Sequence, residues 1–179
     1  MTTMISMTVE KGLYQSQFEN LQKSLRAEPS WLAGIRKAAM DRFLALGFPT
    51  THDEDWRFTS VAPISRIPFK AARSLPRGAA LRKNPTALTF GDWSGPQIVF
   101  VNDQFAPELS ASVGLRNGVL VESLESVLTS QPELLSAHLS RHAGYDEHTF
   151  VALNTGFFQS GTVVRIGKDR QVECEIRLG

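Results

Sequence analysis

Two amphipathic helices are predicted at the start of the chain. Between Thr8 and Arg26, apolar residues recur at spacings of three and four, which places on one helical face Tyr14, Phe18, Leu21 and Leu25. Thr8 is the expected N-cap of this helix. After Pro29 the same spacing predicts a second helix whose apolar face carries Leu32, Ile35, Ala39, Phe43 and Leu46. Because few residues join the two, we expect an antiparallel hairpin that buries both apolar faces.

The second predicted helix has a charged face and a defined end. The charged residues expected largely on its outer face are Arg36, Lys37, Asp41 and Arg42. Gly47 is placed just after the helix, where a glycine often adopts a positive φ. Pro49 prevents the helix from continuing. We therefore expect the helix to end at about Leu46.

A short capped helix is predicted directly after this end. Thr51 and Glu54 have the spacing of a capping box. In that motif the hydroxyl accepts a hydrogen bond from the backbone three residues on, and the carboxylate accepts one from the cap residue. The spacing predicts a helix that begins near His52, with acidic residues in its first turn, where the helix dipole favours them.

The side chains of this short helix have expected partners. Asp53 can pair with Arg57, four residues later. Trp56 and Phe58 are expected to pack onto the two preceding helices. These expectations make the stretch from Gly47 to Ile64 a structural junction.

Histidine and aspartate residues support an alternative, enzymatic interpretation. His52, Asp53 and Asp55 are close in sequence, but adjacent helical residues point in different directions, which favours helix capping over metal binding. His138 and His142 are four residues apart on a predicted helix, the spacing of two metal ligands. Their segment lacks the adjacent glutamate of zinc proteases. A metal-dependent hydrolytic enzyme that uses these five residues stays open as an alternative.

A basic segment follows the predicted junction. Between Ser65 and Pro85 there are three prolines, no acidic residue and six basic ones: Arg66, Lys70, Arg73, Arg77, Arg82 and Lys83. We expect a linker over residues 65–95. An RNA-binding module acting through Arg66–Lys83 is the alternative, but Phe69 alone is available to stack on bases, which favours a solvated linker.

Strands and short helices are predicted in the second half. Gln97–Asn102 is rich in β-branched residues and bounded by turn residues, and Val119–Val121 is its expected partner. Ser123 is expected to cap a short helix. Pro132 opens another helix that is expected to reach about Arg141.

The last thirty residues are predicted to form strands. The region begins with the apolar run Phe150–Phe158, continues beyond Gly161, and turns at 167–169. Four residues then alternate with polar ones, which predicts a strand with one buried face: Val172, Cys174, Ile176 and Leu178. Cys174 on that face is expected to behave as a small apolar residue. Since no further strand follows Gly179, we expect either a fragment or pairing with another copy.

Composition excludes several classes of protein. The 179 residues are 42% hydrophobic and 21% charged, as in an ordinary globular protein. A net charge of +1 gives no general attraction to nucleic acid or to an anionic membrane. There is no run of about 18 apolar residues, and Met1–Lys11 has no basic start followed by an apolar run. The single cysteine excludes an internal disulfide. We expect a soluble, cytoplasmic protein.

Four segments, in a fixed order, carry a further signal. The first contains Gly47, Pro49, Thr51, Glu54, Trp56, Arg57 and Phe58; the others are Val99–Asn102, the Leu-rich Glu122–Leu139, and Phe150–Phe158 with Asn154. Together they resemble the N-terminal part of the SufB/SufD family of iron–sulfur cluster assembly proteins, and SufD in particular. The resemblance covers most of Leu32–Leu178.

The resemblance implies a fold and a function. In that family an N-terminal helical domain precedes a β-solenoid core, SufD pairs with SufB, and both dock on the ATPase SufC. It implies a non-catalytic scaffold subunit with SufB-like and SufC-like partners. Separately from the resemblance, the unpartnered C-terminal strand leaves self-association through that strand open. No catalytic, cofactor-binding or metal residue is carried over from the family.

The expected fold is α+β, with four parts. Residues 1–64 are the helical hairpin and capped turn, 65–95 the basic linker, 96–149 mixed strand and helix, and 150–179 the truncated start of the β-solenoid.

Overall fold

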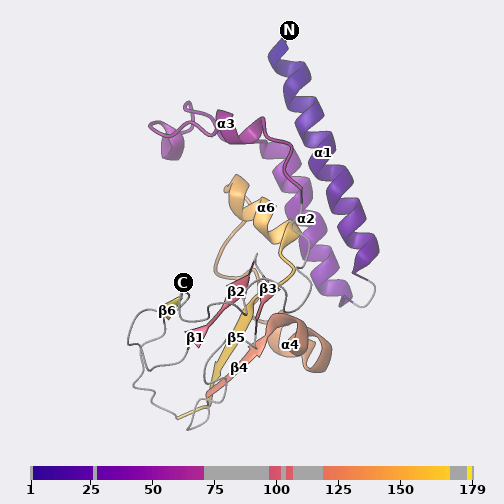
Figure 1. Cartoon of the computed structure of the whole chain (residues 1–179), viewed down its shortest axis with the longest axis vertical. Helices are drawn as coiled ribbons and strands as arrows, with labels where there is room; N and C mark the ends of the chain where they lie inside the picture. The colour runs from indigo at the N-terminus through magenta and orange to yellow at the C-terminus, as the bar shows by residue number, and fades with distance from the viewer. Residues whose placement is uncertain are drawn as a thin grey trace, which may run out of the picture. The chain divides into compact units, whose positions relative to one another are not determined.

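The computed structural model describes residues 2–25, 28–70, 97–101, 104–106, 119–169 and 177–178 (Figure 1). Its elements, in chain order, are α1 (Thr2–Ser24), α2 (Ser30–Leu46), η1 (Glu54–Trp56), α3 (Ala62–Ser65), β1 (Gln97–Ile98), β2 (Phe100–Val101), β3 (Gln104–Phe105), β4 (Val119–Ser123), α4 (Leu124–Ser130), α5 (Pro132–Ser136), α6 (Thr149–Phe157), β5 (Thr162–Ile166) and β6 (Arg177–Leu178). The chain divides into two compact units, residues 1–71 with 131–158 and residues 72–130 with 159–179.

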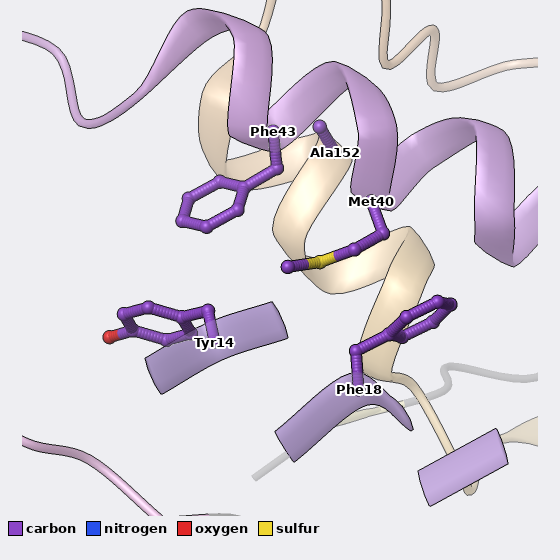
Figure 2. Packing of buried hydrophobic residues seen from close by; sticks show 5 residues of the cluster. All are labelled: Tyr14, Phe18, Met40, Phe43 and Ala152. Atoms are coloured by element: carbon purple, nitrogen blue, oxygen red, sulfur yellow. The ribbon is translucent and has the colours of Figure 1, made fainter. Parts of the chain in front are cut away.

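The core of the first unit lies between α1, α2 and α6. Helices α1 and α2 run side by side in opposite directions (Figure 1). This confirms the antiparallel hairpin that the sequence predicted from their two apolar faces. The buried cluster comprises Tyr14 and Phe18 of α1, Met40 and Phe43 of α2, and Ala152 of α6, whose side chains converge in Figure 2. The rings of Tyr14 and Phe43 meet edge to face with centroids 5.3 Å apart. Burial of these apolar side chains stabilises the unit.

Helix α6 occupies a segment that the sequence assigned to the beginning of the strand region. Its buried positions include Ala152 and Gly156, and a Cβ placed on Gly156 would lie 3.7 Å from Cβ of Met40. These small residues allow α6 to approach α2 closely. A short apolar run has no period that separates a buried helix from a buried strand, so packing against α2 decides the helical state.

Arg36 is buried, although the sequence placed it on the outer face of α2. Its side chain is 2% exposed, and its Nε donates a 2.6 Å hydrogen bond to Oε1 of Glu28. Another nitrogen of the guanidinium group, Nη1, donates to the carbonyl of Gly156 at 3.2 Å. The guanidinium carbon lies 4.1 Å from the ring centroid of Phe158. These partners compensate for burial of the charge. The other three residues predicted on the outer face are exposed, as expected.

Two helix boundaries test the expected caps. Helix α1 begins at Thr2, so Thr8 is an interior residue and not the N-cap. The predicted end of α2 is confirmed, because Gly47 has a φ of 72° and its N–H donates to the carbonyl of Phe43. A glycine adopts this conformation without steric cost.

The second unit pairs its strands differently from the sequence expectation. Strand β4 pairs antiparallel with β5, from Val119 opposite Ile166 to Ser123 opposite Thr162. The expected pairing of β4 with residues 97–102 is wrong, because β1 pairs in parallel with β6 and β2 forms a hairpin with β3. Alternation of apolar residues identifies a strand but not its partner.

Local signals in the second unit are confirmed. The hydroxyl of Ser123 accepts a hydrogen bond from the N–H of Ser126 at 3.1 Å, which is the predicted cap of α4. The N–H of Leu124 also donates to the carbonyl of Gly161 at 2.9 Å. The turn at 167–169 is present, with Asp169 at a φ of 60°.

Helices and small sheets together make the fold α+β, as predicted. The strands of the described ranges form two-stranded sheets, and a β-solenoid stays a prediction. Residues 177–178 pair with β1 of the same chain, where the sequence left pairing with another copy open. The rest of the predicted final strand, including Cys174, lies outside the described residues. The four-part division of the chain also stays a prediction.

Candidate functional site

The turn after α2 is capped by Thr50 and Asp53. The N–H of Thr50 donates to Oδ2 of Asp53 at 2.6 Å, and its hydroxyl donates to the same oxygen at 3.1 Å. The N–H of His52 in turn donates to the hydroxyl of Thr50 at 3.2 Å. The motif therefore resembles a capping box that begins one residue earlier than predicted, and the expected cap by Thr51 and Glu54 is wrong. The helix that follows is the single 3-10 turn η1.

Asp53 serves this turn and does not pair with Arg57. Its pKa lies below the ordinary value of 3.8, because the backbone N–H of Thr50 and then the hydroxyl of Thr50 donate to the ionised carboxylate. The guanidinium carbon of Arg57 lies 5.5 Å from the ring centroid of Phe58 instead. The negative charge of Asp53 thus holds the backbone turn.

Trp56 and Phe58 point to different surroundings. The half-buried Trp56 ring packs on Phe150 of α6, with centroids 5.2 Å apart and planes tilted by 50°. Phe58 is 93% exposed, so the expectation that it packs onto the hairpin is wrong. Residues two apart in a helical turn face different directions, and only Trp56 faces α6.

The start of α6 is tied to the loop that follows α2. The hydroxyl of Thr149 donates a buried 2.9 Å hydrogen bond to the carbonyl of Gly47. The ring of Phe48 lies 5.9 Å from that of Phe150. At the other end of α6, Asn154 has an exposed side chain, and its carbonyl accepts from the N–H of Phe158. These contacts position residues 46–56 against residues 147–151.

A cleft of about 430 Å³ lies between these two segments, and we refer to it as the acidic cleft. Its half-buried lining is apolar and consists of Leu46, Phe48, Pro49, Trp56, Phe150 and Val151. Its exposed residues are Asp53, Glu54, Asp55, Glu147 and His148. Thr149 completes the lining. The cleft therefore combines an aromatic interior with an acidic rim.

The negative charge of the rim is not neutralised by the lining. No lysine or arginine is among the lining residues. The ion pairs formed within the described part of the chain, Arg36 with Glu28 and Lys37 with Asp41, lie elsewhere. Among the described residues, none of these four carboxylates forms an ion pair with a lysine or an arginine, so the rim is negatively charged and complements a cation.

His138 and His142 do not have the geometry that the sequence predicted. Helix α5 ends at Ser136, and a left-handed residue at Ser140, with a φ of 60°, follows in the turn. Both histidines are exposed and neither is helical, so the spacing of two ligands on one helix is absent. Across the described ranges, no three His, Cys, Asp or Glu residues lie close enough together to hold a metal ion.

Two further sequence interpretations are only partly covered by the structure. Of the basic segment, Arg66 and Lys70 are exposed, whereas residues 71–96 lie outside the described ranges. The RNA-binding interpretation therefore stays a prediction. Among the described helices, none has both the length and the apolar character needed to cross a bilayer.

The sequence did not identify Glu147, His148 and Thr149 as neighbours of the junction. They are separated from Asp53 by more than ninety positions, and no local spacing connects them. Arg36 is different, because it lies four residues after Leu32 and so shares its helical face. That spacing alone could have identified it as a buried residue.

Comparison with known proteins gives the family. Residues 7–178 match the model of the SufBD protein N-terminal region. An iron–sulfur cluster assembly SufBD family protein of Synechocystis sp. is 28% identical over 151 residues, which are 84% of this chain and 32% of that protein. The chain thus spans about a third of that relative's length, and no solved structure matches it. Because the family model covers almost the whole chain, the chain belongs to the SufBD family and carries its N-terminal region.

Proposed function

We propose that the chain is the N-terminal part of a SufD-type scaffold subunit that acts, without catalysis of its own, in an iron–sulfur cluster assembly complex. The observation that carries this proposal is the family match over residues 7–178. The similar Synechocystis protein is named as an iron–sulfur cluster assembly protein. The partners are SufB-like and SufC-like subunits, and the complex is cytoplasmic.

The contacts of residues 47–56 support a structural role for these residues. The carboxylate of Asp53 is engaged by Thr50, and the ring of Trp56 packs on Phe150. Gly47 supplies a positive φ and accepts the hydrogen bond of Thr149. Each of these roles stabilises the fold and needs no substrate, which supports a scaffold over an acid–base enzyme.

Co-purification tests the proposal. The full-length native protein, tagged and expressed at its normal level in its own cells, is expected to bring down SufB-like and SufC-like subunits in fixed stoichiometry. Deletion of its gene is expected to lower the activity of several iron–sulfur enzymes, and the intact gene to restore it. Purification without either subunit, together with unchanged iron–sulfur enzymes in the deletion strain, would overturn the proposal.

Metal analysis separates the scaffold from the enzymatic alternative. The scaffold proposal expects no stoichiometric zinc or iron that depends on His138. Zinc or iron bound at one atom per chain and lost in His138→Ala would contradict it. Glu133→Gln, an exposed change on α5, is the control for nonspecific effects.

A further inference from the structure

We infer that the acidic cleft binds the side chain of an arginine that a partner protein presents next to an apolar residue. The inference goes beyond the proposed assembly function and does not depend on it. It starts from the aromatic lining of the cleft. The negative charge of the rim then indicates which kind of side chain the cleft binds. The volume of about 430 Å³ lies within the range of sites that hold small ligands or single side chains.

The apolar lining provides a surface for a flat cation. The rings of Trp56 and Phe150 are 5.2 Å apart and inclined at 50°, and both side chains are half-buried, so part of each ring faces the cleft. A guanidinium group stacks on such rings through its plane and is attracted by their negative faces. A bare carboxylate or phosphate has no such attraction to this surface.

The rim selects for positive charge. Asp53, Glu54, Asp55 and Glu147 contribute four carboxylates, and none of them forms an ion pair with a lysine or an arginine among the described residues. Charge complementarity therefore favours a cation and disfavours the phosphates of a nucleic acid. The planar guanidinium also matches the two oxygens of a carboxylate.

A metal ion fits this cleft less well than an organic cation. All the lining residues belong to the described ranges, where no three His, Cys, Asp or Glu residues lie close enough together to hold a metal. No three of the rim carboxylates therefore converge on one point. A guanidinium group, which carries five N–H donors in a broad fork, suits dispersed acceptors better than a metal does.

The walls of the cleft are held in place before anything binds. The hydrogen bond from Thr149 to the carbonyl of Gly47 joins the two segments, and the hydrogen bonds between Thr50 and Asp53 fix the turn. A site that needs little ordering on binding loses less affinity to entropy. The geometry is thus suited to reversible docking of a short segment.

Phe58 is the reason to expect an apolar residue next to the arginine of the partner. It follows Trp56 by two residues, is 93% exposed, and has the guanidinium of Arg57 near its ring. Aromatic residues and arginine are enriched in protein interfaces relative to the rest of the protein surface. Phe58 does not line the cleft but lies two residues from Trp56 in the sequence, so we expect an apolar neighbour of the arginine to cover it.

Peptide titration of the intact chain tests the inference. The probe is a blocked pentapeptide with a central arginine between two leucines and terminal alanines. The control peptide carries citrulline, the uncharged analogue of arginine. We expect a saturable shift of the Trp56 indole N–H signal in NMR, assigned with Trp56→Phe. Affinity for the citrulline peptide is expected to be lower by at least about tenfold, and binding to weaken as salt rises from about 20 to about 300 mM.

Matched variants separate the cleft from general charge effects. Asp55→Asn combined with Glu147→Gln is expected to weaken arginine peptide binding by at least about tenfold, because two rim charges are lost. Glu133→Gln, which removes an exposed charge outside the cleft, is expected to bind like the parent. Circular dichroism checks that the double variant keeps its helical content, since both residues are exposed.

Several results would overturn the inference. They are equal binding of the arginine and citrulline peptides, the absence of saturable binding, or a saturable shift that leaves the Trp56 signal unchanged. Self-association of the parent that disappears in the double variant would identify a second copy as the occupant and also overturn it. Co-purification of SufB-like and SufC-like subunits with the double variant would leave the proposed function intact, so the two failures are distinguishable.

Discussion

The hydroxyl of Thr149 donates a 2.9 Å hydrogen bond to the carbonyl of Gly47 across 102 positions of the sequence. Both residues are buried. Gly47 directly follows the last residue of α2, and Thr149 is the first residue of α6, so this bond joins two helix ends. It also joins the two segments that line the acidic cleft, residues 46–56 and 147–151.

Replacing Thr149 with Val keeps the shape of the side chain and removes the donor. We expect the free energy of unfolding to fall by about 1–3 kcal/mol, because the buried carbonyl of Gly47 is left without this partner. Urea denaturation measures the change. Thr129→Val is the matched control, since the hydroxyl of Thr129 bonds to its own helix on an exposed surface. A loss of equal size in both variants would contradict the role assigned to Thr149.

Arg36→Met is expected to be among the most destabilising changes in the first unit. It leaves the carboxylate of Glu28, which is 10% exposed, without its 2.6 Å partner, and the expected loss is about 3–5 kcal/mol. Adding Glu28→Gln should recover part of this loss because it removes the unpaired charge. Denaturant unfolding of the two variants provides the comparison. No recovery in the double variant would show that the ion pair is not the source of the effect.

Trp56→Ala is expected to cost about 2 kcal/mol, less than a fully buried tryptophan, because Trp56 is half-buried and packs on one side against Phe150. Asp55→Asn should change stability little, since Asp55 is exposed. Thermal unfolding of both variants against the parent measures the difference. Equal midpoints for Trp56→Ala and the parent would contradict the packing of this ring on α6.

Stability should depend on Asp53 in acid. The folded pKa of Asp53 lies below the unfolded value because Thr50 donates to the carboxylate. The ionised group therefore stabilises the fold above about pH 4, and this contribution is lost as the pH falls through the folded pKa. Asp53→Asn should remove that part of the decrease between about pH 5 and about pH 2, measured by unfolding at each pH. Asp55→Asn should retain it, and an identical slope in both variants would contradict the assignment.

Gly156 should tolerate a methyl group and reject a larger side chain. A Cβ at this position would lie 3.7 Å from Cβ of Met40 and 3.8 Å from the carbonyl oxygen of Arg36, which are ordinary contacts. Gly156→Ala is expected to be neutral or to stabilise the protein by up to about 1 kcal/mol, because glycine loses more backbone freedom on folding. Gly156→Leu should cost about 1–3 kcal/mol through overpacking against α2. Thermal midpoints that fall equally in both variants would contradict this close packing.

Local patterns in the sequence determined much of the first unit. The spacing of Tyr14, Phe18 and Leu21 gave the buried face of α1 correctly, because helical geometry brings residues three and four apart onto one side. The positive φ of Gly47 and the cap by Ser123 were predicted for equally local reasons. The ordered segments also led to the family, since their residues can be read without the fold.

Other features were decided only by the tertiary structure. The run from Thr149 to Phe157 is helical because α2 offers it a complementary surface, and its apolar composition fits either state. Strand β4 pairs with β5, a distant segment of the chain. The sequence could not predict this partner, because alternation of apolar residues identifies a strand but not the strand that it pairs with. The acidic cleft exists because α6 brings Glu147 and Phe150 to the turn that holds Asp53 and Trp56. Such contacts between distant segments depend on the packing of the whole unit, which no local spacing encodes.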